Sequence, residues 1–219
     1  MATETTSFVF SSLAGSEIYN APPPPVMEKM AAGAFVSLCK HLQALSDEVQ
    51  NIDMMNISGF CRNCLAKWMV LEARKLAKNL RQDAEFAVGF TSSTEEYRST
   101  VKALDGLGYD EAAQEVYGCT YPEWKKRHQK KASEEQMKIY NENTHLHAVH
   151  DKDLLKKAVD GGDEMLLNYC QKYLSEKVMT RLKAGAFSNL CIHLRERSDV
   201  IQNVELMTIS GFCRNCLAK

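Results

Sequence analysis

The chain has 219 residues, of which 45% are hydrophobic and 25% are charged, as is usual for a globular protein. Its net charge of −1 provides no general attraction to nucleic acid or to an anionic membrane, so we expect neither as a partner. No apolar run approaches the ~20 residues that span a bilayer, and the N-terminus lacks the basic residues of a secretory or transit signal. These features predict a cytoplasmic protein with reduced thiols.

The N-terminal residues 1–26 are rich in Ser, Thr, Ala and Pro and end in the run Pro22–Pro25. This composition predicts a disordered tail with a short extended polyproline segment. A first helix is expected from near Met27, because apolar residues then follow at steps of three and four. They are Met30, Ala34, Phe35, Leu38, Leu42 and Leu45, with His41 on or beside the same face.

The second helix carries a Cys-Arg-Asn-Cys motif near its start. We expect residues 50–56 to be a connector and Asn56 or Ser58 to be the N-cap. One stripe of this helix is apolar, and we expect the basic residues to lie on its other, solvated faces. The stripe contains Cys61, Leu65, Met69, Ala73, Leu76 and Leu80, and the basic residues include Arg62, Lys67, Arg74 and Lys78.

Further helices are expected over residues 95–104, 110–117, from Tyr121 onward and over 133–140. Gly118 is placed to end one of them, and Ser133 with Gln136 forms a capping box. Almost nothing reads as a strand. The sequence therefore predicts an all-α fold with a complete multi-helix domain over residues 27–142, followed by a helical connector over 143–177.

A long segment occurs twice in the chain. Residues Met30–Lys67 recur as Leu182–Lys219 at a constant offset of 152, and the stretch from Ile57 to Lys67 is repeated without change. A duplication of this size indicates a unit of structure. We interpret residues 178–219 as a truncated second copy of the first two helices, and we expect it to dock weakly or to remain mobile.

The repeated Cys-x-x-Cys is the most plausible functional site, and we consider three roles for its thiols. Thiols near a helix N-terminus are easily ionised and can bind a metal such as zinc or iron. The candidate ligands are Cys61, Cys64 and His41, with their repeat equivalents Cys213, Cys216 and His193. The pair can instead cycle between dithiol and disulfide, although the βαβ context of thioredoxin-like proteins is absent. In the third interpretation, the two thiols only pack against the first helix.

Three histidines, His145, His147 and His150, form a second candidate metal cluster in the connector, although histidines in a polar segment often have no such role. Asp53 is Glu205 in the second copy, and a catalytic carboxylate tolerates such a change poorly. We therefore interpret Asp53 as a helix cap or a surface charge.

The combination of Ala-Gly-Ala-Phe, Gly-Phe-Cys-Arg-Asn-Cys-Leu and the later Tyr121-Pro122-Glu123-Trp124 resembles the domain of unknown function 1244 family. The resemblance covers about Met30–Tyr140 and implies a compact all-helical domain without an established activity. We expect a binding or scaffold module with a Cys-x-x-Cys face, whose partner is another protein or another copy of the chain. The alternative is a metal-dependent or thiol-redox enzyme that uses Cys61, Cys64 and His41.

Overall fold

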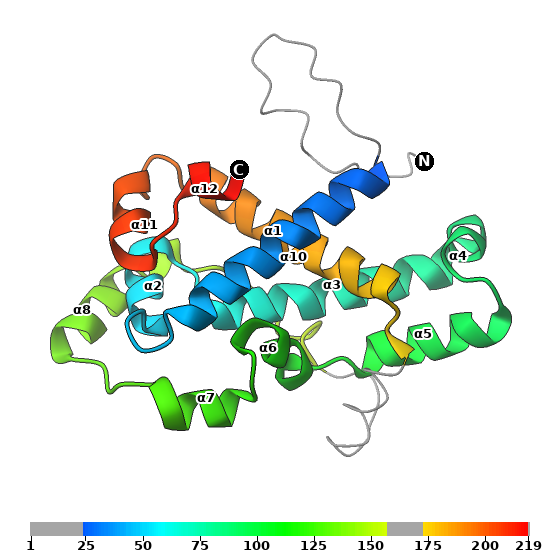
Figure 1. Cartoon of the computed structure of the whole chain (residues 1–219), viewed down its shortest axis with the longest axis horizontal. Helices are drawn as coiled ribbons and strands as arrows, with labels where there is room; N and C mark the ends of the chain where they lie inside the picture. The colour runs from blue at the N-terminus through cyan, green and yellow to red at the C-terminus, as the bar shows by residue number, and fades with distance from the viewer. Residues whose placement is uncertain (1–23, 157–172, 219) are drawn as a thin grey trace, which may run out of the picture.

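The computed structural model describes residues 24–156 and 173–218, which form helices and no strand (Figure 1). The all-α prediction is therefore confirmed. Most of the predicted N-terminal tail and residues 157–172 of the predicted helical connector lie outside the described residues. The helices are α1 Pro24–Ala44, α2 Asn51–Ser58, α3 Arg62–Gln82, α4 Ala84–Phe90, α5 Thr94–Gly106, α6 Tyr109–Tyr117, α7 Tyr121–His128, α8 Glu134–Glu142, η1 Thr144–Leu146, α10 Glu176–Glu196, α11 Asn203–Ser210 and α12 Arg214–Ala218.

Helix α3 lies at the centre of the core. It packs against α5 and α6 on one side and against α10 on the other, while α1 crosses α10 (Figure 1). The predicted apolar stripe of α3 is confirmed, because each of its members, from Cys61 to Leu80, is buried. Removing this stripe from water is the main source of stability for such a helix, at about 25 cal/mol per Å² of apolar surface.

Two helices begin where the sequence predicted none. Residues 50–56 are not a connector: they belong mostly to α2, whose N-cap Gln50 donates its backbone N–H to Asp53 at 3.2 Å. Asp53 is thus a capping residue, one of its two predicted roles. Helix α4 begins after Asp83, whose carboxylate accepts from the backbone N–H of Phe86 at 2.9 Å.

The first helix also starts earlier than expected, at Pro24 instead of Met27. Pro24 and Pro25 occupy its first turn, where the missing N–H of proline leaves no hydrogen bond unmade. The predicted extended conformation is therefore wrong for these two residues. The predicted stop at Gly118 is confirmed by its left-handed backbone, with φ of 73°. The capping box of Ser133 and Gln136 at the start of α8 is confirmed as well.

The second copy is firmly packed, against our expectation of a weakly docked or mobile fragment. Helix α10 packs against both α1 and α3, and α11 contacts α2 (Figure 1). The apolar face of α10 is buried at Leu182, Ala186, Phe187, Leu190 and Leu194. The first copy supplies the surface that this amphipathic helix needs. Among the described helices, none combines the length and the apolar character that crossing a bilayer requires.

Candidate functional site

The Cys61–Cys64 pair lies at the N-terminus of α3, directly after a sharp turn. Gly59 ends α2 with φ of 68°, a left-handed conformation that favours glycine. Phe60 then enters the core, and Cys61 becomes the N-cap of α3. The carbonyl oxygen of Gly59 accepts from the backbone N–H of Ala148 at 2.7 Å. A segment from beyond α8 thus holds the turn that presents the two thiols.

The two residues between the cysteines are structural anchors. Arg62 was expected on a solvated face, but its side chain is fully buried and donates to the carbonyl oxygens of Leu42 and Val49 at 2.7 and 2.8 Å. Its guanidinium also lies 5.3 Å from the ring centroid of Trp124. The side-chain oxygen of Asn63 accepts from the hydroxyls of Tyr109 and Tyr117. These bonds fix the first turn of α3 and therefore the direction of both sulfur atoms.

The two thiols have very different acidities. The pKa of Cys61 is lowered to about 7, chiefly because Cys64 donates a hydrogen bond to it and also because backbone N–H groups of the first helical turn face it. The pKa of Cys64 is raised well above its usual value by the same hydrogen bond and by burial. Cys39 lies in the core, where burial raises its pKa to about 12. Cys61 is thus the thiol of this group that ionises near neutral pH.

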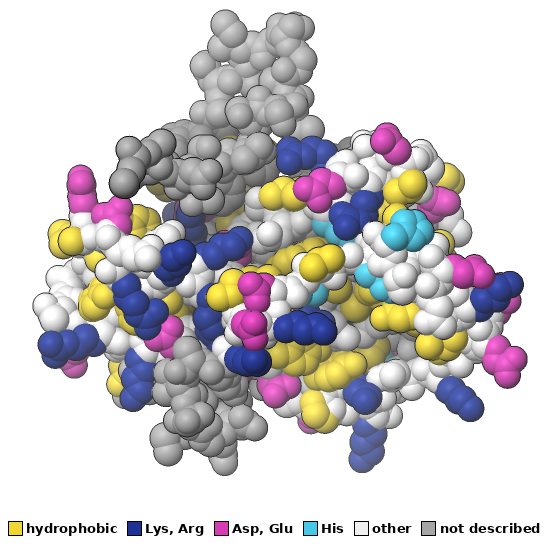
Figure 2. Space-filling model, turned by 180° about the vertical axis from the view of Figure 1, so that it is seen from behind, with side chains coloured by type: hydrophobic (Ala, Val, Ile, Leu, Met, Phe, Trp, Pro, Cys, Tyr) yellow, Lys and Arg dark blue, Asp and Glu magenta, His cyan; other side chains and the backbone are white. Residues whose placement is uncertain are grey.

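Both cysteines line a pocket of about 580 Å³, which we call the cysteine pocket. Its titratable residues, apart from the two cysteines, are Lys67, Lys130, Lys131, Tyr121, Tyr140, His147 and His150, and no Asp or Glu belongs to its described lining. Seen from behind, histidine side chains gather on one side of the molecule, with both basic and acidic side chains near them (Figure 2). The charge of the pocket, apart from its thiolate, is therefore positive.

Two of these histidines have ring nitrogens without a hydrogen-bond partner among the described residues. They are Nε2 of His147 and both ring nitrogens of His150. Burial lowers the pKa of His150 to about 4, and Lys67 contributes to this shift. The His150 ring is therefore neutral at pH 7, with a lone pair available to a ligand.

The predicted ligand His41 does not lie in the cysteine pocket. Its Nε2 donates to the carbonyl oxygen of Ser210 at 2.7 Å, across the contact between the two copies. His193 makes the equivalent bond to the carbonyl oxygen of Ser58, also at 2.7 Å. Both histidines thus join one copy to the other.

The second thiol pair occupies the same position in the repeat but has different surroundings. The sulfur atoms of Cys213 and Cys216 are 3.7 Å apart, and Cys216 is exposed. Within residues 24–156 and 173–218, no three His, Cys, Asp or Glu side chains come close enough to hold a metal ion. The structure therefore does not assemble a four-thiol site between the copies, and metal binding stays a prediction.

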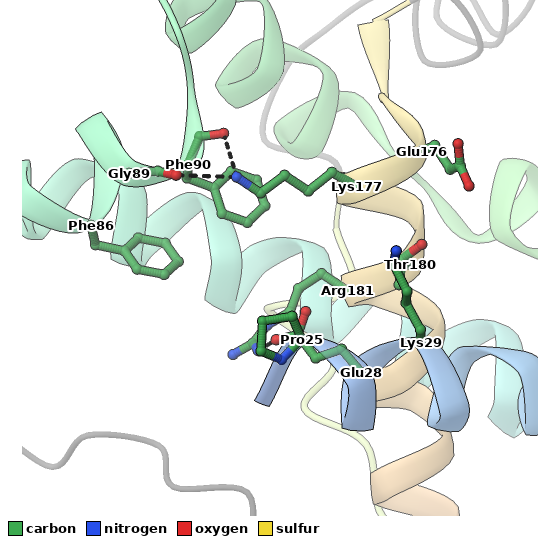
Figure 3. Close-up of a pocket in the computed structure, with 10 residues that line it drawn as sticks. All are labelled: Pro25, Glu28, Lys29, Phe86, Gly89, Phe90, Glu176, Lys177, Thr180 and Arg181. Carbon is green, nitrogen blue, oxygen red and sulfur yellow. Dashed lines mark hydrogen bonds and ion pairs between the residues drawn. The ribbon is translucent and has the colours of Figure 1, made fainter. Parts of the chain in front are cut away.

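A larger cavity of about 620 Å³ lies elsewhere, where α1, α4 and α10 meet (Figure 3). The ammonium group of Lys177 donates to the carbonyl oxygens of Gly89 and Phe90, each at 3.1 Å, and lies 4.4 Å from the ring centroid of Phe90. Glu28 and Arg181 form an ion pair in its wall. Glu28 and Arg181 are thus engaged with each other, and Lys177 is engaged with backbone carbonyl groups. Its lining contains no cysteine or histidine, so size alone does not make it the better candidate.

The profile of a family described as "Protein of unknown function (DUF1244)" matches residues 49–104, 98–142 and 201–219, together just over half of the chain. The chain belongs to this family. The resemblance noted in the sequence is therefore confirmed, including a match in both copies. No curated protein and no solved structure gives a match to the chain.

The family match contains the Cys-x-x-Cys of both copies but not the whole cysteine pocket. His147 and His150 lie beyond residue 142, where the match ends. Sequence reasoning singled these histidines out but did not connect them with the cysteines. The contact depends on the bond between Ala148 and Gly59, which are far apart in the chain, so no local pattern pointed to it.

Proposed function

We propose that the protein is a binding module whose functional centre is the cysteine pocket, with the Cys61 thiolate as its reactive group. The observation that carries this proposal is the pairing of Cys61 with Cys64 at the N-terminus of α3. The lowered pKa of Cys61 increases the fraction of its thiol that is ionised at neutral pH. The thiolate is the form of cysteine that binds metals and attacks electrophiles.

The charge of the pocket supports an anionic ligand. Three lysines and no Asp or Glu line it among the described residues, and cationic side chains attract a carboxylate or phosphate. The positive field of the lysines offsets the charge of the thiolate. A small anion is therefore favoured over a cationic or an apolar ligand.

Two alkylating reagents test this proposal. Iodoacetate is an anion and iodoacetamide is neutral, so the ratio of their rates at one cysteine reports the local field. We expect this ratio to be several times higher at Cys61 than at the exposed Cys216, as measured by mass spectrometry of the peptides. Lys67→Gln should lower the ratio at Cys61, while Lys78→Gln, on an exposed position of α3 outside the pocket, should not. Equal ratios at Cys61 and Cys216 would contradict the anionic ligand.

A soft metal ion is the second candidate ligand. It is favoured by the unpartnered ring nitrogens of His147 and His150, which line the same pocket as the two thiols. No three of these side chains are close enough to share a metal in the described structure, so binding would require them to move together. Thiolate and imidazole are the ligands that zinc prefers. Untagged protein purified without chelator should then contain about one zinc per chain, lost in Cys61→Ser but kept in the matched variant Cys213→Ser. Absence of metal from the unmodified protein would reject this second candidate.

A further inference from the structure

The contacts between the two copies are related by an approximate two-fold symmetry. The bond from His193 to Ser58 is matched by the bond from His41 to Ser210, and each residue is 152 positions from its counterpart. The ring contacts between phenylalanine and histidine are reciprocal in the same way. The rings of Phe60 and His193 have centroids 5.8 Å apart, and those of Phe212 and His41 are 6.2 Å apart. Such reciprocity is the property of an isologous dimer interface, here within one chain.

A pair of equivalent residues lies where the two-fold axis must pass. Phe60 and Phe212 occupy the same position in the two copies, and their ring centroids are 6.4 Å apart. Each is buried, with an exposed fraction of no more than 4%. A residue that contacts its own counterpart marks the axis of a two-fold interface. The contact is therefore symmetric in both its polar bonds and its apolar centre.

Two equivalent glycines of this interface have different neighbours in the described structure. Gly185 of α10 lies so close to α3 that an added Cβ would overlap the side chain of Glu72, and Asn189 donates to Glu72 at 2.9 Å. Apart from its own helix, Gly33 of α1 has no described atom within 4 Å of such a Cβ. Nearby, a cavity of about 270 Å³ is lined by His41, Phe212 and Cys216. Among the described residues, no helix covers the face of α1 around Gly33 in the way that α3 covers Gly185.

We propose that the surface of the first copy now covered by α10–α12 is a homotypic docking surface that accepts the first copy of a second chain. In that dimer, His41 donates to the partner's Ser58, and Gly33 lies against the partner's Glu72. Helix α3 of each chain then covers Gly33 of the other, as α3 covers Gly185 within the single chain. In the single chain, the second copy is held near this surface by its covalent link. Such a link gives an effective concentration of about millimolar, so the unmodified chain is monomeric at micromolar concentration.

The two glycines provide a test with matched controls on the full chain. Leucine has a higher helix propensity than glycine, so neither substitution should harm its own helix. Gly185→Leu should push α10 from α3 and free the docking surface, and the chain should become a dimer in light scattering at about 100 µM. Gly33→Leu, where space is open, should stay monomeric. The double variant should also be monomeric, because Gly33 takes the place of Gly185 in the dimer.

Release of the second copy is measured separately, through Trp68, whose ring centroid lies 5.8 Å from that of His193. Acrylamide should quench tryptophan fluorescence more strongly once α10 has left. If Gly185→Leu alone leaves quenching unchanged, His193→Glu is added to break the bond to Ser58. A folded variant with exposed Trp68 that remains monomeric overturns the proposal. The proposal is also overturned if the double variant associates as strongly as Gly185→Leu does. Association that does not depend on Gly33 would not use the proposed interface.

Discussion

His193 Nε2 lies 2.7 Å from the carbonyl oxygen of Ser58, the last residue of α2 in the other copy. Ser58 directly precedes the turn that carries Phe60 into the core and Cys61 to the start of α3. The second copy therefore stabilises the loop that presents the thiols of the first copy. The copy-to-copy contact and the cysteine pocket are parts of one structure.

The burial of His193 predicts a dependence of stability on pH. Burial lowers the pKa of His193 from its usual 6.5 to about 4 in the folded state. The unfolded chain then binds the proton more readily, so stability falls as pH is lowered from about 6.5 to about 4. The loss from this group is on the order of 1–3 kcal/mol.

In His193→Gln, which keeps a donor toward Ser58 but cannot titrate, the difference between urea midpoints at pH 7 and pH 5 should shrink. It does not vanish, because His150 is affected in the same direction. His145→Gln, at an exposed position, serves as the control and should leave the difference unchanged. An unchanged difference in His193→Gln would show that His193 is not a buried neutral donor.

Arg62 and Arg214 are equivalent residues with different degrees of burial, so the same substitution can be compared at both. Arg214 donates to the carbonyl oxygens of Leu194 and Ile201 at 2.7 and 2.8 Å, the counterparts of the bonds of Arg62. Arg62 is fully buried, whereas Arg214 is partly exposed, so water can replace its bonds. We expect Arg62→Leu to lower the free energy of unfolding by roughly 2–4 kcal/mol and Arg214→Leu by about 1 kcal/mol. Equal losses in urea denaturation would contradict the anchoring role of Arg62.

The parts of the fold that depend on local patterns were predictable from the sequence. The buried stripe of α3, the stop at Gly118 and the capping box at Ser133 each rest on neighbouring residues. Helix α2 was missed because its N-cap is Gln50, an uncommon capping residue, and because its apolar residues follow no clear helical period. Asp53, three positions later, was the available signal.

The candidate site was predictable only in part. The thiol pair was visible in the sequence, but the burial of Arg62 was not, because arginine on an amphipathic helix is usually solvated. Its retention as Arg214 within the unbroken repeat was the signal that could have revealed it. The partners of His41 and His193 lie more than 130 residues away in the chain, and no local pattern indicates such contacts.

Gly59 and Gly118 have the same left-handed backbone but different neighbours. A Cβ on Gly59 would overlap the backbone carbonyl of Leu146, whereas one on Gly118 would meet the flexible side chain of Gln43 at 3.1 Å. The left-handed conformation alone costs an alanine about 1–2 kcal/mol. We expect Gly118→Ala to lose about that much stability and Gly59→Ala to lose more.

Gly59→Ala should also displace the segment that carries His147 and His150, and so change the alkylation rate of Cys61 while Gly118→Ala does not. Thermal melts and peptide mapping measure the two effects. Equal losses of stability in both variants would show that the contact with Leu146 is unimportant.

The central claim is that Cys61 is an ionised thiol because Cys64 donates to it. The rate of iodoacetamide reaction at Cys61, followed by mass spectrometry from pH 5 to pH 10, tests it most directly, with the core thiol Cys39 as an unreactive internal control. The account predicts a midpoint near pH 7 in the unmodified chain and a midpoint shifted upward, toward pH 9, in Cys64→Ala. A midpoint near pH 9 already in the unmodified chain, or no shift in Cys64→Ala, would contradict it.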